Sequence, residues 1–183
     1  MLTVLLGGTR SGKSALAEQL AQQAAAQDGQ SVTYIATAAV DADDEEHVRR
    51  VALHRARRPS SWVTLECQQT SDLVSQLREL PGVVLVDSLG SWLVRHPDFV
   101  TDTDALLSAL RARGRTAPTL VVTEEVGWSV HPPTELGRRY IDALGAVNQQ
   151  VAVVADRVLL VVAGRTLELS PSGLPASARE SNR

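Results

Sequence analysis

The sequence predicts an α/β fold, a mostly parallel sheet with helices on both faces, from three observations. Apolar runs without strict alternation recur along the chain, which is typical of strands buried on both faces. Stretches with a helical spacing of Leu, Val and Ala separate these runs and favour right-handed crossovers. The first apolar run leads into a glycine-rich loop, G-x-x-x-x-G-K-S, at residues 7–14. Together they predict a P-loop nucleotide-binding fold with its ligand at the carboxyl ends of the strands.

The elements follow from their patterns. Strands are expected at residues 2–6, 32–36, 83–86, 119–122 and 158–162, and helices at 12–27, about 44–57, 71–80, 102–113 and 135–155. Residues 158–162 and 166–169, joined by a turn at 163–165, predict a C-terminal antiparallel hairpin at the edge of the sheet. Residues 170–183 contain Ser, Pro and Gly without an apolar period and predict a disordered tail. We therefore expect a single domain over residues 1–169.

The glycine-rich loop carries the strongest functional signal. Glycines let backbone N–H groups turn toward phosphate oxygens, a lysine reaches the β- and γ-phosphates, and a serine hydroxyl ligates Mg²⁺. Lys13 is the only lysine among the 18 Lys and Arg residues, so lysine is kept where a compact ammonium suits phosphates. A glycine turn that binds nothing is the alternative. We expect Lys13 to be catalytic and the whole loop to bind the nucleotide: Gly7, Gly8, Thr9, Arg10, Ser11, Gly12, Lys13 and Ser14.

Carboxylates follow two of the predicted strands. The run at 83–86 ends at Asp87, a position at which an acid beside the glycine loop holds Mg²⁺ through water. Capping of the next helix is the alternative role for Asp87. Ser14 and Asp87 are therefore the expected magnesium residues. Glu124 and Glu125 end the strand predicted at 119–122, and we expect one of them to face the site.

Composition argues against several classes of function. A net charge of -3 and the lack of a basic stripe disfavour nucleic acid as a partner. No apolar run approaches the roughly 18 residues of a membrane span, and no signal-peptide pattern is present. We therefore expect a cytoplasmic protein without an integral membrane segment. The single cysteine, Cys67, predicts neither an internal disulfide nor a zinc site.

The segment at residues 41–59 has an ordered charge pattern. Acidic residues open a predicted helix and arginines close it, which is the order that the helix dipole favours. His47, Arg50, His54 and Arg58 follow one another at helical spacing, so imidazoles and guanidiniums share one face. Such a face suits a polyphosphate. A solvated helix with a favourable charge order is the alternative.

Taken with the loop, residues 54–66 resemble the H-x-x-x-R-P-x-x-W-x-T-x-E block of the bifunctional adenosylcobinamide kinase/adenosylcobinamide-phosphate guanylyltransferase family. Other blocks similar to that family occur in the same order, namely Y-I-A-T-A at 34–38, L-V-D at 85–87, E-V-G at 125–127 and R-R-x-x-D-x-x-G-x-x-N-Q at 138–149. The resemblance extends to Leu169. Glu124 departs from it, because a neutral Asn is common there in the family.

The resemblance implies a function in two steps. The family phosphorylates the aminopropanol hydroxyl of adenosylcobinamide and then transfers GMP from GTP to that phosphate through a guanylylated histidine. By position in the motif, His54 would be that histidine, and a neutral imidazole is nucleophilic near pH 7. Nucleotide binding would involve Arg55, Arg58 and Glu66 as well as Asp87 and the glycine loop.

The resemblance also implies the ligands and the assembly. These are Mg²⁺, a small corrinoid substrate, GTP (or ATP for the kinase step) and a homo-oligomer, a trimer in the family. Two alternatives remain open. One is a monofunctional P-loop kinase for another small hydroxyl substrate, and the other is a non-catalytic nucleotide-sensing regulator.

Overall fold

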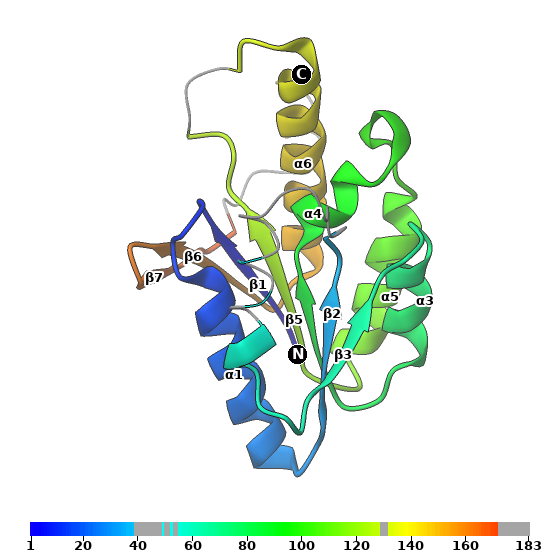
Figure 1. Ribbon diagram of the computed structural model, residues 1–183, viewed down its shortest axis with the longest axis vertical. Helices are drawn as coiled ribbons and strands as arrows, with labels where there is room; N and C mark the ends of the chain where they lie inside the picture. The colour runs from blue at the N-terminus through cyan, green and yellow to red at the C-terminus, as the bar shows by residue number, and fades with distance from the viewer. Residues whose placement is uncertain (39–48, 50–51, 53–54, 129–131, 172–183) are drawn as a thin grey trace.

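A seven-stranded sheet forms the centre of the protein, with the strand order β3-β2-β4-β5-β1-β6-β7 (Figure 1). The structure, a computed structural model, describes residues 1–38, 49, 52, 55–128 and 132–171. The strands are β1 (Leu2–Gly7), β2 (Val32–Ala36), β3 (Val63–Glu66), β4 (Val83–Asp87), β5 (Thr119–Glu124), β6 (Arg157–Val162) and β7 (Arg165–Glu168). All neighbouring strands pair in parallel except β6 and β7, which form an antiparallel hairpin.

Helices cover both faces of this sheet. They are α1 (Lys13–Asp28), α3 (Asp72–Glu79), α4 (Leu89–Val94), the 3-10 helix η1 (Pro97–Phe99), α5 (Thr103–Gly114) and α6 (Glu135–Val154). Successive residues of a strand point to opposite faces, and the central strands are buried on both. Leu5 packs in the core beneath α1. Val4 and Leu6 pack in the second core, to which α3, α4, α5 and α6 contribute.

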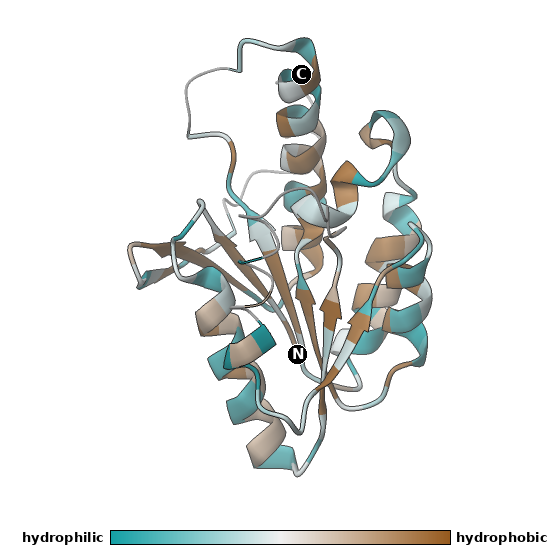
Figure 2. Cartoon of the chain, in the orientation of Figure 1, coloured by the Kyte–Doolittle hydropathy of each residue, from teal (hydrophilic) through white to brown (hydrophobic). Residues whose placement is uncertain are grey.

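Figure 2 shows the consequence of this arrangement. The central strands are brown, and the helices around them show teal on the sides turned away from the sheet. Because both faces of β1, β4 and β5 are covered, packing on two sides fixes the backbones of these strands. The end of β1 lies beside that of β5, and the end of β4 lies on the other side of β5.

The predicted fold class is confirmed, including the C-terminal hairpin. The expected strands agree with β1, β2, β4, β5 and β6 within two residues at each end. Three elements were not predicted: the mostly exposed edge strand β3, the short helix α4 and the 3-10 helix η1. No helix in the described part of the chain has both the length and the apolar character needed to cross a membrane.

Two expectations fall largely on residues that the structure does not describe. For the helix expected at about 44–57, positions 49, 52 and 55–57 are helical, and the remainder lies outside the described residues. Arg58 follows in a bend, so it does not continue the helical face as expected. The tail from residue 172 onward also lies outside the described residues. Its disorder, and the domain boundary at 169, stay predictions.

Candidate nucleotide-binding site

The glycine-rich loop joins the end of β1 to the start of α1. A Cβ on Gly7 would lie 2.5 Å from Ser11 Oγ and 2.5 Å from the backbone oxygen of Val161, so only glycine fits. Gly12 has a φ of 98°, a left-handed conformation that favours glycine. The backbone N–H of Gly164, in the β6–β7 turn, donates a 2.8 Å hydrogen bond to the Ser11 carbonyl. The loop is thus shaped by its own glycines and fixed by the neighbouring hairpin.

Lys13 is the first residue of α1, and its side chain is only 11% exposed. Its Nζ lies 3.3 Å from the Gly8 carbonyl oxygen and 4.0 Å from Glu124 Oε1. The helix is preceded by Gly12, which has no side chain to cap the first turn. The ammonium and the positive end of the helix dipole therefore lie at the same place, which suits phosphate binding.

Glu124 ends β5 and occupies a space that Gly90 leaves open. Its Oε2 accepts a 3.1 Å hydrogen bond from the Gly90 backbone N–H. A Cβ on Gly90 would overlap this oxygen and lie 2.7 Å from Tyr140 Oη, so any side chain there would displace the carboxylate. Burial raises the pKa of Glu124, while a hydrogen bond with Ser88 and the charge of Lys13 act in the opposite direction.

The structure also shows which of the two glutamates lies beside the loop. Glu125 accepts a 2.8 Å hydrogen bond from the Gly127 backbone N–H and is engaged within its own turn. Glu124 is the one beside Lys13. Asn148 of α6 fixes the end of β5, because its Nδ2 donates to the Glu124 carbonyl at 3.0 Å and its Oδ1 accepts from Thr123 Oγ1 at 2.6 Å.

Asp87 ends β4, and its Oδ2 accepts a 2.7 Å hydrogen bond from Tyr34 Oη. The role of helix cap belongs to the next residue, since Ser88 Oγ accepts from the Ser91 backbone N–H at 3.3 Å. Helix capping, the alternative for Asp87, is therefore not its role here. The Asp87 carboxylate instead lies at the carboxyl end of the sheet, two strands away from the glycine loop.

The residues expected at a metal fit Mg²⁺ held together with a nucleotide. Ser14 offers a hydroxyl and Asp87 a carboxylate, and Mg²⁺ prefers oxygen ligands. Among the described residues, no group of three or more His, Cys, Asp or Glu side chains could hold a metal. Mg²⁺ commonly takes one or two protein ligands and completes its shell with water and substrate phosphates. Ser14 and Asp87 match that mode of binding.

A second feature is an open pocket of about 350 Å³ beside β3. Its lining includes Arg55, Arg58, Trp62, Thr64 and Glu66. Arg55 forms an ion pair with Glu66, and Arg58 Nη1 donates to Thr64 Oγ1 at 3.3 Å. The pocket therefore brings together the three nucleotide-binding residues that the sequence suggested outside the loop and Asp87.

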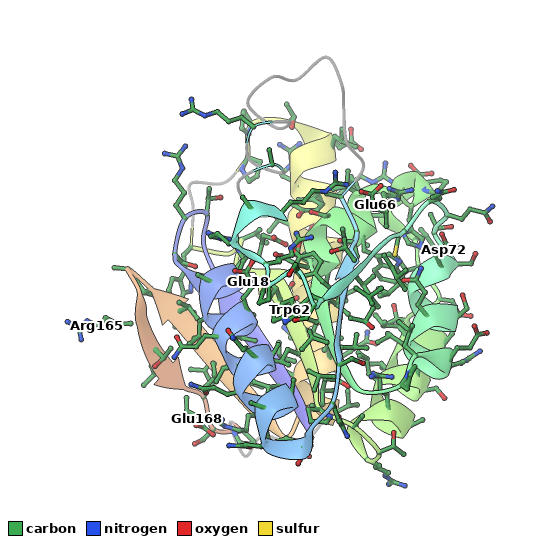
Figure 3. All side chains as sticks on the ribbon, turned by 60° about the horizontal axis from the view of Figure 1, so that its bottom comes forward. Glu18, Trp62, Glu66, Asp72, Arg165 and Glu168 are labelled. Carbon is green, nitrogen blue, oxygen red and sulfur yellow. The ribbon has the colours of Figure 1, made fainter. Side chains whose placement is uncertain are left out.

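The pocket is connected to the sheet and to α1. The guanidinium carbon of Arg58 lies 3.3 Å from the centre of the Tyr34 ring, on β2. Arg57 Nη2 lies 3.4 Å from Glu18 Oε1, on α1. Figure 1 and Figure 3 agree that the helical residues 55–57 lie against α1, and Figure 3 shows Glu18 and Trp62 on this side of the sheet. Through Glu18 and Tyr34, the arginine-rich segment thus contacts β2 and also α1, the helix that begins at the glycine loop.

The histidines are mostly outside the part of the chain that the structure describes. His54, the expected nucleophile, is among the undescribed residues, as are His47 and His131. The ring of His96 packs edge-on against Trp92 with centroids 4.4 Å apart, and Nδ1 lies 3.0 Å from the Trp92 carbonyl oxygen. These contacts are those of a residue that supports the end of α4.

Several residues at the site had no individual role in the sequence interpretation. Tyr34 and Asn148 stand within the blocks at 34–38 and 138–149, but their partners are distant in the sequence: Tyr34 and Asp87 are separated by 53 residues. Gly90 gave no signal, because its significance depends on the carboxylate that lies against it. The sequence did offer one sign for each of the other two residues: Tyr34 is a tyrosine within a predicted buried strand, and Asn148 is an asparagine on the apolar face of a predicted helix. A buried polar group of this kind needs a hydrogen-bond partner.

Comparison with known proteins places the chain in a family. A family model described as cobinamide kinase / cobinamide phosphate guanyltransferase matches residues 3–169. A bifunctional adenosylcobalamin biosynthesis protein, CobP, of Pseudomonas aeruginosa is 42% identical over 179 residues, covering 92% of this chain and 97% of the relative. The bifunctional adenosylcobalamin biosynthesis protein CobU of Escherichia coli is 33% identical over 183 residues, covering 90% of this chain and 97% of the relative.

Solved structures support the fold. A KaiC-like protein of Pyrococcus horikoshii superposes with a TM-score of 0.53 at 16% identity, covering 87% of this chain and 69% of that one. The flagellar accessory protein FlaH of Methanocaldococcus jannaschii gives 0.51 at 13% identity, covering 90% and 74%. At this identity the likeness concerns the fold alone. The family match over nearly the whole chain, with relatives that are themselves covered to 97%, shows that the chain belongs to the cobinamide kinase / cobinamide phosphate guanyltransferase family.

Proposed function

We propose that the protein phosphorylates adenosylcobinamide on its aminopropanol hydroxyl and then transfers GMP from GTP to the new phosphate. The observation that carries this proposal is the glycine loop at the end of β1. Lys13, the first residue of α1, reaches back over this loop, and its Nζ lies 3.3 Å from the Gly8 carbonyl oxygen. Membership in the family supports both steps. The proposal implies that the protein is an enzyme of cobalamin biosynthesis. It also implies that the enzyme acts in the cytoplasm, where GTP and ATP are available.

In the kinase step the substrate hydroxyl attacks the γ-phosphorus and gives up its proton to solvent, while the bond to the β-phosphate oxygen breaks and the nucleoside diphosphate leaves. Lys13 neutralises the developing charge on the β- and γ-phosphates, and the backbone of the glycine loop orients them. Ser14 and Asp87 would hold Mg²⁺, which when bound supplies further charge neutralisation between those phosphates. The kinase nucleotide is GTP or ATP.

In the guanylyl step His54 is the proposed nucleophile. An imidazole nitrogen forms a bond to the α-phosphorus of GTP while the bond to the β-phosphate oxygen breaks and pyrophosphate leaves. A phosphate oxygen of cobinamide phosphate then attacks the same phosphorus and releases the imidazole. Arg55 and Arg58 would neutralise transferring phosphates, and Glu66 would accept hydrogen bonds from the nucleotide. Support comes from the pocket in which these three side chains meet.

The test of the covalent step uses GTP labelled at the α-phosphate. His54→Ala should lose the acid-labile, base-stable label on the protein and the GDP-cobinamide product, yet still make cobinamide phosphate, because no covalent step precedes that product. His47→Ala is the matched control and should keep the label. Labelling that survives in His54→Ala and disappears in His47→Ala would place the nucleophile at His47.

The same experiment separates the alternatives. A monofunctional P-loop kinase would make the phosphorylated product without any protein-bound label or pyrophosphate. A nucleotide-sensing regulator would bind GTP and release neither pyrophosphate nor a phosphorylated corrinoid. If neither histidine variant changes the labelling of an active enzyme, only His96 and His131 remain as candidates.

We also propose a homo-oligomer, a trimer as the family resemblance implies. Support comes from the C-terminal hairpin, where Val162 is 49% exposed and Leu167 is 61% exposed. Covering apolar side chains in an assembly would remove them from water. Light scattering of the purified protein would give the mass, and a mass of one chain at micromolar concentration would contradict the proposal.

A further inference from the structure

Tyr34 contacts both the expected metal residue and the arginine-lined pocket. It lies in the middle of β2, is 2% exposed and belongs to the core beneath α1. Its hydroxyl lies 2.7 Å from Asp87 Oδ2. The face of its ring lies 3.3 Å from the guanidinium carbon of Arg58. One buried side chain therefore joins a carboxylate at the end of β4 to a guanidinium that lines the pocket.

The hydroxyl acts on Asp87 as a hydrogen-bond donor. A phenol carries a proton and an ionised carboxylate can only accept one, so the Tyr34 O–H donates to Asp87 Oδ2. A donor at 2.7 Å fixes the rotation of the carboxylate and occupies Oδ2. Because β2 pairs directly with β4, the sheet itself sets this distance.

The ring acts on Arg58 as a flat support. A guanidinium above an aromatic face is attracted by the ring quadrupole, and the attraction grows when water is excluded. On its other edge, Arg58 Nη1 donates to Thr64 Oγ1 at 3.3 Å. Arg58 Nε is buried and has no hydrogen-bond partner among the described residues. Among the described residues, Tyr34 and Thr64 therefore both help to orient this guanidinium.

We propose that Tyr34 is a positioning residue shared by the two steps: its hydroxyl orients Asp87 toward the metal–nucleotide complex, and its ring orients Arg58 for guanylyl transfer. The inference rests on the proposed function. It assigns separate effects to two parts of one side chain. Removal of the hydroxyl alone should change the metal dependence of both steps, whereas removal of the ring should in addition impair the guanylyl step selectively.

Tyr34→Phe tests the hydroxyl. The Mg²⁺ concentration for half-maximal rate should rise on the order of 10-fold in both steps, the effect of losing one hydrogen bond to a charged group. Calorimetric binding supplies a readout independent of turnover: affinity for GTP with Mg²⁺ should fall, and affinity for GTP in EDTA should stay the same. At saturating Mg²⁺ the ratio of guanylyl to kinase rate should match the unmodified protein.

Tyr34→Leu tests the ring. It should show the same shift in Mg²⁺ dependence and, at saturating Mg²⁺, a guanylyl rate that falls a further 3- to 10-fold, roughly the contribution of a cation–π contact at a half-buried arginine. In an Arg58→Gln background, Tyr34→Leu should cause no further selective loss of the guanylyl rate, because the ring acts through Arg58. If Tyr34→Leu is too unstable to assay, Tyr34→Met fills the space with a flexible apolar chain and takes its place.

Ile35→Val is the matched control for packing. Ile35 follows Tyr34 in β2 but belongs to the core on the opposite face, so this variant loses core volume without touching Asp87 or Arg58. It should leave the Mg²⁺ dependence and the rate ratio unchanged. Unchanged Mg²⁺ dependence in Tyr34→Phe would overturn the role of the hydroxyl, and equal rate ratios in Tyr34→Leu and Tyr34→Phe would overturn that of the ring. Failure of the proposed function would look different, because the unmodified protein would itself lack one of the steps.

Discussion

Lys13 lies between two oxygen acceptors, the Gly8 carbonyl oxygen at 3.3 Å and Glu124 Oε1 at 4.0 Å. The first keeps the ammonium over its own loop, and the second balances its charge in a partly buried place. A lysine can move between such partners and phosphate oxygens because its ammonium is a compact charge on a flexible stem. This explains why a chain that otherwise uses arginine has lysine here.

Lys13→Ala should reduce both the kinase and the guanylyl rates by about 10² to 10³, the usual effect of removing one group that stabilises a developing anion. The reason is that both reactions use nucleotide held at the same loop. Steady-state assays of each step would measure it, with circular dichroism to verify folding. Full activity of a folded Lys13→Ala variant would remove the loop from the mechanism.

Glu124→Gln should stabilise the protein without ligand near pH 7, by on the order of 1 kcal/mol. Because the pKa of Glu124 is raised in the folded state, the folded chain holds this proton more tightly than the unfolded chain does. Stability is therefore highest below the ordinary glutamate pKa and falls as pH rises toward the raised pKa. The amide removes this loss.

Urea unfolding at several pH values between 4 and 8 measures that effect as the difference between the two proteins. The gain from Glu124→Gln should grow with pH and then level off. A variant less stable than the parent at pH 7 would mean that the interactions with Lys13 and Gly90 outweigh the cost of burying the carboxylate.

At the scale of elements, the unit formed by β1, the loop and α1 depends on one glycine for its shape. Gly7→Ala should lower the free energy of unfolding by about 1–3 kcal/mol or more, the cost of overpacking, because the new Cβ would meet the Val161 backbone oxygen. Gly8→Ala is the matched control, since no atom lies within 4 Å of the position its Cβ would take. Thermal unfolding without nucleotide should separate the two, and equal stability would contradict the steric argument.

Most elements could be predicted from the sequence because buried elements have a recognisable pattern of apolar residues. The strands β1, β4 and β5 are nearly continuous apolar runs, as burial on both faces requires. The strand β3 has no such apolar pattern, because it lies at the edge of the sheet and is mostly exposed; Val63, for example, is 50% exposed. The helix α4 has six residues, too few to show a helical period.

The site could be predicted in part for a related reason. Residues in a contiguous motif, such as the glycine loop, are recognisable because the spacing itself carries the chemistry. Contacts such as that between Tyr34 and Asp87 require knowledge that β2 pairs with β4. The choice between Glu124 and Glu125 likewise depended on which side of β5 faces α1, and the sequence left it open.

At the scale of the whole molecule, a bound nucleotide should stabilise the folded state. The loop, Glu124 and Asp87 come from three adjacent strands, so a nucleotide at their ends would link elements that meet only through the sheet. A ligand that binds only the folded state stabilises it by about 2.7 kcal/mol at 100 times its dissociation constant.

GTP with Mg²⁺ should therefore raise Tm by roughly 5–10 °C in a domain of this size. Differential scanning fluorimetry measures the shift in Tm, and most of this shift should be absent in Lys13→Ala. ATP should be tested in parallel, because a similar shift with both nucleotides would indicate that the loop reads the phosphates and not the base. No shift with either nucleotide would contradict a folded, competent site.

The hydrogen bond from the Gly164 N–H to the Ser11 carbonyl decides where the protein can be modified for experiments. Hairpin turns at a sheet edge are usually the first choice for inserting a tag or a fluorescent label, because they tolerate extra residues. This hairpin turn is an exception, since an insertion beside Gly164 would move the support of the loop. The turn after α1 is the better choice: Gly29 has no atom within 4 Å of its Cβ position, and the whole length of α1 separates it from the loop.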